Sequence, residues 1–353
     1  MIDSTQPTND LSTSRIMLPI VIGAMVLIYF IVSKINLQDF INISWNAKMI
    51  FWVCLAVVFL IIRHLAYAMR LRILSQGVFS WLKSIQLIFI WEFSSAVSPT
   101  AVGGSAAALF VLSREKISTA RVTAIVLYTA ILDTIFFVGS LPILYMLYGA
   151  SIIRPGLTDL ANLDGWGKSF VLAYCFMAIY GMFFFYGLFM KPQGIKKIAL
   201  WITSLGWLKR WRKKAEKLGD DFIVASKELS ANGFSFGLKA FLATATAWSC
   251  RFILLNCLII AFQQDVSIDL FTQGALFGRL ETMFVIMAFS PTPGSAGVAE
   301  ILFYSFINDY IPSETTASVV AILWRFLTYY LYILIGALVI PAWIRNLVRR
   351  KKT

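Results

Sequence analysis

Long apolar stretches alternate with short polar ones along most of the chain. Six apolar runs are each long enough for a helix to cross the hydrocarbon core of a bilayer, which takes about 20 residues. They lie at about 16–35, 49–69, 122–148, 169–190, 238–262 and 316–344. Two further apolar stretches, 84–112 and 272–308, are interrupted near their centres by residues that break helices. The pattern predicts an all-α polytopic membrane protein with six full spans and two broken helical segments.

The two interruptions are similar in sequence. The second reads Ser-Pro-Thr-Pro-Gly-Ser-Ala-Gly-Val-Ala-Glu at 290–300, and the first reads Ser-Pro-Thr-Ala-Val-Gly-Gly-Ser at 98–105. Proline removes a backbone donor and glycine loosens the chain, so at membrane depth such backbone must be buried in protein or line a polar cavity. A tight turn in an ordinary loop is the alternative. The candidate site residues in the two clusters are Pro99, Gly103, Gly104, Pro291, Pro293, Gly294 and Gly297.

The two clusters belong to a weak internal repeat. They are offset by 192 residues, the stretch at 120–126 resembles the one at 317–323, and Arg63 aligns with Arg251 at an offset of 188. Slowly drifting offsets are typical of a duplication with small insertions. Weak symmetry of this kind marks transporter folds whose broken helices meet at a site near the bilayer midplane. We therefore predict one transmembrane domain, 16–344, built from related halves at 16–148 and 169–344.

Composition places the chain among integral membrane proteins. Hydrophobic residues make up 59% of it, and the mean hydropathy is +0.77. The formal net charge is +13, but the basic residues lie in short segments between apolar runs, which is typical of cytoplasmic loops and not of a nucleic-acid groove. The four cysteines fall in apolar runs and His64 is the only histidine, so we expect no metal site and no cofactor.

The distribution of Lys and Arg predicts the topology. If both broken segments enter the membrane and return on the same side, 22 basic residues lie in cytoplasmic loops and the tail, and four lie outside. The segment 191–239 alone holds eleven of them and forms the predicted basic cytoplasmic loop, and 345–353 forms a basic cytoplasmic tail. Six spans plus two opposed re-entrant hairpins then form an inverted repeat with both termini in the cytoplasm. The polar segment 1–15 is predicted to be disordered.

Nine ionisable side chains fall within the apolar segments. They are Arg63, His64, Glu92, Asp133, Arg251, Arg279, Glu281, Glu300 and Arg325. One interpretation is that they neutralise one another as structural ion pairs, for example Arg279 with Glu281. The other is that Arg63, Arg251 and Arg325 face a cavity and hold a phosphate, with Asp133 nearby and with Glu300 binding a cationic headgroup or a proton.

A polar stretch between two spans has a mixed character. The stretch 194–217 interleaves Trp201, Trp207 and Trp211 with five Lys or Arg residues at 209–214. Such a segment is either amphipathic and lies on the anionic inner leaflet, or is a solvated basic loop.

The residues around the second cluster resemble a known family. They are Pro291-Thr292-Pro293-Gly294 followed by Gly297 and Glu300, together with the earlier Pro99 and Gly103-Gly104 and with Arg325. This pattern is similar to the flippase-like family named for the transmembrane region of lysylphosphatidylglycerol synthase. The chain departs from that family at Ser105 and Ser295. The resemblance implies a multi-pass protein of the bacterial or archaeal inner membrane. Some members are proposed to move lipids or lipid-linked intermediates between leaflets.

From this resemblance we expect a lipid translocase and not an enzyme, because the aminoacyl transferase domain of the best-known members does not occur in this sequence. The expected partners are an anionic phospholipid or a lipid-linked intermediate, and a lipid-synthesis enzyme. Movement would follow a lipid gradient, a partner's work, or a proton gradient through Glu300 or Asp133. Two alternatives stay open: an intramembrane enzyme that uses Glu300 or His64 as a base on lipid headgroups, and a non-transporting scaffold or regulator.

The predicted topology makes a direct prediction about accessibility. The test places single cysteines in a background without the native cysteines, at Ser118, Ser204, Ser267 and Ser313. A membrane-impermeant thiol reagent then shows which side of the membrane of intact cells each position faces. Positions 118 and 204 should be cytoplasmic, and positions 267 and 313 external. Labelling of 118 or 313 from the opposite side would mean that the broken segments cross the membrane, which would contradict the inverted repeat.

Overall fold

Every regular element in the described part of the chain is helical. The computed structural model describes residues 25, 29, 32, 37–41, 43, 45–98, 100–115, 117–230 and 232–352. Five helical spans are long and apolar enough to cross a membrane: α3 (Ala47–Leu74), α6 (Thr119–Tyr148), α7 (Gly165–Phe189), α10 (Phe234–Phe262) and the combined span Glu314–Leu347. Each matches one of the predicted spans. The first predicted span, 16–35, and the segment 1–15 lie outside the described residues, apart from Met25, Tyr29 and Val32.

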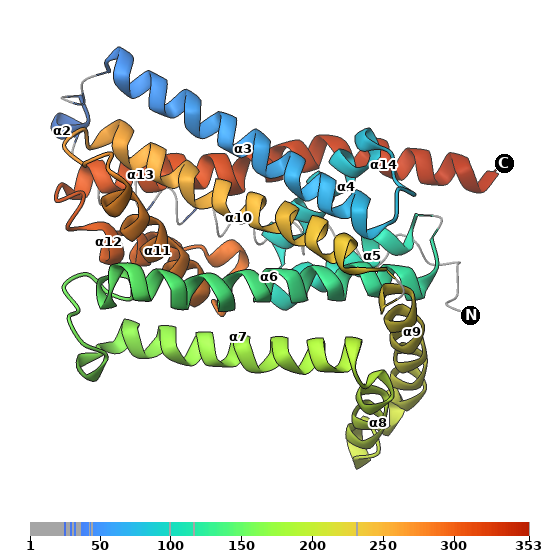
Figure 1. Cartoon of the computed structure of the whole chain (residues 1–353). Helices are drawn as coiled ribbons and strands as arrows, with labels where there is room; N and C mark the ends of the chain where they lie inside the picture. The colour runs from blue at the N-terminus through green and yellow to red at the C-terminus, as the bar shows by residue number, and fades with distance from the viewer. Residues whose placement is uncertain are drawn as a thin grey trace.

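The long helices run side by side as a bundle, in which α3 and α10 pack along each other (Figure 1). Their starts are fixed by side chains that accept hydrogen bonds from the first free backbone N–H groups, as Asn46 does for α3 and Ser118 does for α6. Apolar residues continue around these helices, because one face meets other helices and the opposite face meets lipid. The short helix α2 (Leu37–Ile41) precedes α3, and the turns η1 (Ala150–Ile152) and η2 (Leu160–Asn162) connect α6 to α7.

Two helix pairs correspond to the predicted broken segments. The first pair is α4 (Trp81–Val97) with α5 (Thr100–Ser113), and the second is α11 (Leu270–Met287) with α12 (Val298–Ile307). The partners in each pair pack against each other, and the two pairs lie toward opposite ends of the bundle (Figure 1). With 18 residues or fewer, each of these helices is shorter than the ~30 Å hydrocarbon core at ~1.5 Å per residue.

The two breaks differ in their local structure. In the first, α4 ends at Val97 and α5 begins at Thr100, so Gly103 and Gly104 lie inside a helix and do not form part of the break. Pro99 lies outside the described residues. The second break is longer and contains the turn η4 (Pro293–Ser295). Glycine is required there, because Gly294 and Gly297 adopt φ values of 55° and 84°.

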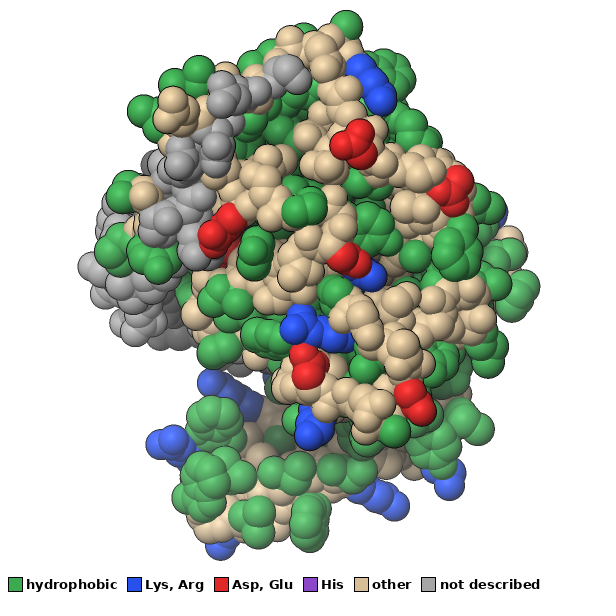
Figure 2. All heavy atoms as spheres, turned by 90° about the vertical axis from the view of Figure 1, so that its left-hand side faces the viewer, with side chains coloured by type: hydrophobic (Ala, Val, Ile, Leu, Met, Phe, Trp, Pro, Cys, Tyr) green, Lys and Arg blue, Asp and Glu red, His purple; other side chains and the backbone are tan. Residues whose placement is uncertain are grey.

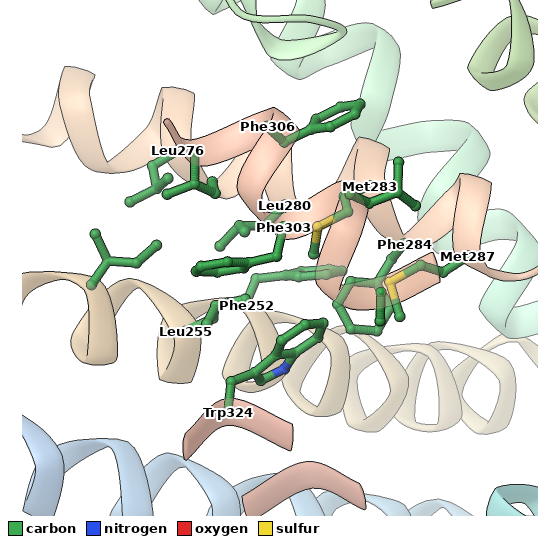
Figure 3. Close-up of a cluster of buried hydrophobic side chains, with 14 of the residues drawn as sticks. Phe252, Leu255, Leu276, Leu280, Met283, Phe284, Met287, Phe303, Phe306 and Trp324 are labelled. Carbon is green, nitrogen blue, oxygen red and sulfur yellow. The ribbon is translucent and has the colours of Figure 1, made fainter. Parts of the chain in front are cut away.

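The second helix pair is embedded in the largest hydrophobic core. Side chains of α11 and α12 pack against those of α10 and against Trp324 of α13 (Glu314–Arg325) (Figure 3). The cluster includes Phe252, Leu255, Leu276, Leu280, Met283, Phe284, Met287, Phe303 and Phe306. This packing fixes the position of the second break inside the bundle.

The last span is interrupted by one turn of π-helix. It consists of α13, the π-helical turn η5 (Phe326–Tyr330) and α14 (Leu331–Lys352). The π turn begins directly after Arg325, and such turns often occur at functional sites. Most of the segment 345–353, predicted as a tail, continues α14 as helix.

The predicted basic loop 191–239 is mostly helical. It contains α8 (Pro192–Ile202), the turn η3 (Gly206–Trp211) and α9 (Arg212–Ser230), after which α10 begins. Helices α8 and α9 pack together and project from one end of the bundle (Figure 1). Trp201, Trp207 and Trp211 are exposed, and Figure 2 shows hydrophobic side chains beside Lys and Arg on this projecting part. The opposite end of the bundle, which faces the viewer in Figure 2, carries several acidic side chains.

Close packing between α4 and α14 predicts the effect of a small substitution. A Cβ at Gly336 would lie 2.5 Å from the Cβ of Phe93, so Gly336→Ala should overpack this contact and destabilise the protein by about 1–3 kcal/mol. Gly139→Ala is the matched control, because position 139 is helical and has no neighbour within 4 Å. Thermal unfolding in detergent should show a lower midpoint for Gly336→Ala and an unchanged or higher one for Gly139→Ala. Equal midpoints would contradict this packing.

Candidate functional site

A cavity of ≈ 370 Å³ lies between the two breaks. Asp133 is near the midpoint of α6 and Arg251 is near the midpoint of α10, which places the cavity about halfway along the bundle. The first helix pair contributes Ser95, Ser98, Gly104 and Ser105, and the second break contributes Ser290, Thr292, Gly294 and Ser295. Two segments almost two hundred residues apart therefore meet at one cavity.

The cavity wall combines polar groups with aromatic rings. Its charged side chains are Arg70, Glu92, Asp133, Arg251 and Arg325, and its aromatic side chains include Tyr67, Trp91, Trp248, Phe284, Tyr329 and Tyr332. Ligand pockets have this mixture of mostly apolar lining and a few placed polar groups, and they commonly measure about 300–1,000 Å³.

Arg63 lies behind this wall and is fully buried. Its guanidinium donates hydrogen bonds to the Glu92 carboxylate at 2.9 Å and to the Tyr332 hydroxyl at 3.0 Å. Both partners line the cavity, whereas Arg63 itself does not. Because its charge is neutralised by Glu92, Arg63 supports the wall and orients two of its polar groups.

Arg70 is a cavity residue that lies just beyond the apolar run predicted as a span at 49–69. Helix α3 continues to Leu74, and Arg70 is one of its buried residues. The Arg70 guanidinium donates a hydrogen bond to the Asp133 carboxylate at 2.5 Å. Asp133 also accepts a hydrogen bond from the indole N–H of Trp248 at 2.8 Å. The spacing of Arg63, Tyr67 and Arg70 was the missed signal, because residues at i, i+4 and i+7 share one helix face. Both guanidiniums lie over the Tyr67 ring.

Arg251 is the unpaired cation of the cavity wall. In the described part of the chain no carboxylate lies within ion-pair distance of it and it makes no hydrogen bond. Its Nε is buried without a partner. The guanidinium lies over the rings of Trp248, at 5.3 Å, and Phe284, at 4.7 Å. Cation–π contacts offset only part of the cost of removing a charge from water.

Arg325 and Glu300 form an ion pair that stabilises the second break. Their side chains are almost fully buried, and Arg325 Nε lies 3.1 Å from Glu300 Oε1. Arg325 also donates to the Gly294 carbonyl at 2.8 Å, and the Gly297 backbone N–H donates to Glu300 at 2.8 Å. The pair therefore satisfies backbone groups that the break releases from the helix.

The structure places the other predicted residues in different surroundings. Pro291 is exposed, and Pro293 and Gly297 are half-buried; none of these three lines the cavity. Gly103 lies in α5. His64 does not line the cavity either; it stacks on Phe89, and its ring nitrogens lie 3.3 Å from the Tyr332 hydroxyl and the Ile85 carbonyl.

The ion pair proposed between Arg279 and Glu281 does not form. Arg279 instead donates to both oxygens of Asp309, at 2.6 and 2.7 Å. Residues two apart on a helix point in different directions, so the side chains of Arg279 and Glu281 do not meet. Glu281 contacts Ser140 of α6. The described residues contain no cluster of three His, Cys, Asp or Glu side chains suited to a metal ion.

The comparisons with known proteins agree with the membrane fold. A UPF0104 membrane protein from Archaeoglobus fulgidus is 24% identical over 311 residues, which cover 84% of this chain and 89% of that protein. No solved structure matches the chain. The family described as the lysylphosphatidylglycerol synthase TM region matches residues 16–336. Since this match covers nearly the whole chain, the protein belongs to the family of the lysylphosphatidylglycerol synthase TM region.

Proposed function

We propose that the protein moves an anionic lipid, or a lipid-linked intermediate, between the leaflets of the bacterial inner membrane. The headgroup enters the central cavity while the acyl chains stay in the surrounding lipid. The family supports a role in the membrane, and the cavity supports a small polar ligand. The partners in this proposal are membrane lipids and an enzyme that synthesises them, with no nucleic acid, and no chemical conversion of the lipid is involved.

The observation that carries the proposal is the unpaired Arg251 in the cavity wall. Arg251 is half-buried, so its charge is partly removed from water without a partner, and an anionic ligand in the cavity would relieve the cost. Guanidinium binds phosphate oxygens through two parallel hydrogen bonds. The neighbouring arginines are already neutralised, Arg70 by Asp133 and Arg325 by Glu300. A phosphate that enters the cavity would therefore bind at Arg251.

The helix arrangement supports an alternating-access mechanism. We infer six spans and two re-entrant hairpins, α4–α5 and α11–α12, that enter from opposite faces. The order of α3, the first hairpin and α6 is repeated by α10, the second hairpin and α13–α14. The excess of Lys and Arg in α8–α9 and at the C-terminus supports a cytoplasmic location for that end and for both termini. A site between two opposed hairpins can open first to one leaflet and then to the other.

Removal of the Arg251 charge should impair exchange. Arg251→Gln should slow leaflet exchange of a fluorescent phosphatidylglycerol in proteoliposomes roughly tenfold or more, because charged hydrogen bonds contribute about 1.5–3 kcal/mol. Arg114→Gln is the matched control, since Arg114 also lies over an aromatic ring, that of Phe110, but outside the cavity. Wild-type rates in Arg251→Gln, or no exchange by the wild type above protein-free vesicles, would contradict the proposal.

The second break should be less tolerant of substitution than an external loop. Gly294→Ala introduces a left-handed alanine, which costs about 1–2 kcal/mol, and places a Cβ 2.0 Å from the Tyr329 ring at the cavity wall. Gly156→Ala introduces a similar backbone strain at φ 73° in open space. Lipid exchange should fall clearly in Gly294→Ala and stay near the wild-type rate in Gly156→Ala. Similar rates in both variants would argue against a site at the break.

A further inference from the structure

Glu281 is a buried carboxyl group without a cation. Its residue is 0% exposed in α11, and no Lys, Arg or His in the described part of the chain lies within ion-pair distance. Its Oε2 is buried without a hydrogen-bond partner. An ionised carboxylate in such a place would be far more costly than a neutral carboxylic acid.

The hydrogen bonds around Ser140 indicate where the proton lies. Ser140 Oγ is 2.6 Å from the Phe136 carbonyl and is also hydrogen-bonded to Glu281 Oε1. A serine hydroxyl has one hydrogen, and a carbonyl oxygen can only accept. If Ser140 donates to Phe136, then Glu281 must donate to Ser140. Each of the two contacts therefore has a hydrogen of its own only when Glu281 carries a proton.

We propose that Glu281 is a proton-binding site and that its proton couples transport to the pH gradient. This inference rests on the proposed function, and it assigns the ion whose movement is coupled to that of the lipid. The proton passes from Glu281 to a water molecule on one side of the membrane, and the carboxylate takes up another from water on the opposite side. This exchange moves only a proton, so it requires no oxidant or reductant.

The carboxyl groups predicted to carry a proton are less suited to the role. Asp133 is held by Arg70, and Glu300 is held by Arg325. Each of these carboxyls neutralises a buried arginine, which would lose its counter-charge if the carboxyl became neutral. Glu281 lacks that constraint, so its charge can change when water reaches it.

The groups that face Glu281 are mostly uncharged. Helices α6, α7, α10, α12 and the turn η1 pack against α11. Among their titratable side chains, Tyr174 of α7 interacts electrostatically with Glu281, and the Tyr174 hydroxyl donates to the Val138 carbonyl. On α11 itself, Arg279 is neutralised by Asp309. A change of charge at Glu281 is therefore not compensated locally.

Helix α11 connects this carboxyl to the cavity. Phe284 lies three residues after Glu281, which is one helical turn, and its ring contacts the Arg251 guanidinium. Phe284 and Met287 of the same helix, and Ala288 directly after it, line the cavity. A shift of α11 when Glu281 ionises would therefore move the wall beside the anion site.

Infrared spectroscopy of the reconstituted protein tests the proton directly. The wild type at neutral pH should show the C=O stretch of a protonated carboxylic acid, and this band should vanish in Glu281→Gln, whose amide N–H can still donate to Ser140. Ser140→Ala should keep the band and shift its frequency, because it removes the acceptor. Glu216→Gln, at an exposed position of α9, should leave the band unchanged. Identical neutral-pH spectra for the wild type and Glu281→Gln would overturn the assignment.

Leaflet exchange of fluorescent phosphatidylglycerol under an imposed pH gradient tests the coupling. The wild-type rate should depend on the gradient, and the rate of Glu281→Gln should be the same with and without it. Wild-type exchange that ignores the gradient would overturn the coupling while the translocase proposal stands. Absence of any wild-type exchange would overturn the translocase and its coupling, and the infrared band would still decide whether Glu281 binds a proton.

Discussion

The compensation of charged side chains inside an apolar bundle is the constraint on which the rest of the structure depends. Each buried arginine must find a carboxylate, a carbonyl or a ligand, because hydrocarbon offers none of the hydration that water provides. Arg63 with Glu92 joins α3 to α4, and Arg70 with Asp133 joins α3 to α6. These pairs lie at about the same depth as the cavity, so the requirement for charge balance also positions its walls.

The same constraint explains how a broken helix is tolerated at the centre of the molecule. The second break releases backbone N–H and C=O groups that would be unsatisfied in lipid. Arg325 binds the Gly294 carbonyl, and Glu300 accepts from the Gly297 N–H, so one ion pair satisfies both sides of the break. The π-helical turn that follows Arg325 places Tyr329 against Gly294. The acidic residue that ends the sequence cluster therefore has a structural role as well as a place near the site.

Much of this arrangement could be predicted from the sequence, because hydropathy and helix breakers are local signals. Five spans and two broken segments lie where the apolar runs placed them. The partners of the charges were harder to predict, since they depend on which helix faces meet. The apolar run ends at Met69 and so does not indicate that Arg70 is buried, although α3 continues for another turn. Asp309, the partner of Arg279, lies 30 residues away along the chain, beyond the reach of any spacing rule.

Two ionisable side chains of the bundle, Arg251 and Glu281, have no oppositely charged partner at ion-pair distance in the described chain. Arg251 has no carboxylate at ion-pair distance in the described chain, whereas the two contacts of Ser140, with Phe136 and Glu281, each have a hydrogen of their own only when Glu281 is neutral. Arg251 and Glu281 are connected through Phe284, which contacts Arg251 and lies one turn from Glu281 on α11. Since no cation lies at ion-pair distance from Glu281 in the described chain, Arg251 would act on Glu281 through the position of α11 and not through direct attraction. An anion that displaces Phe284 from Arg251 would shift α11 and change the access of water to Glu281, so binding of the ligand and exchange of the proton would be linked.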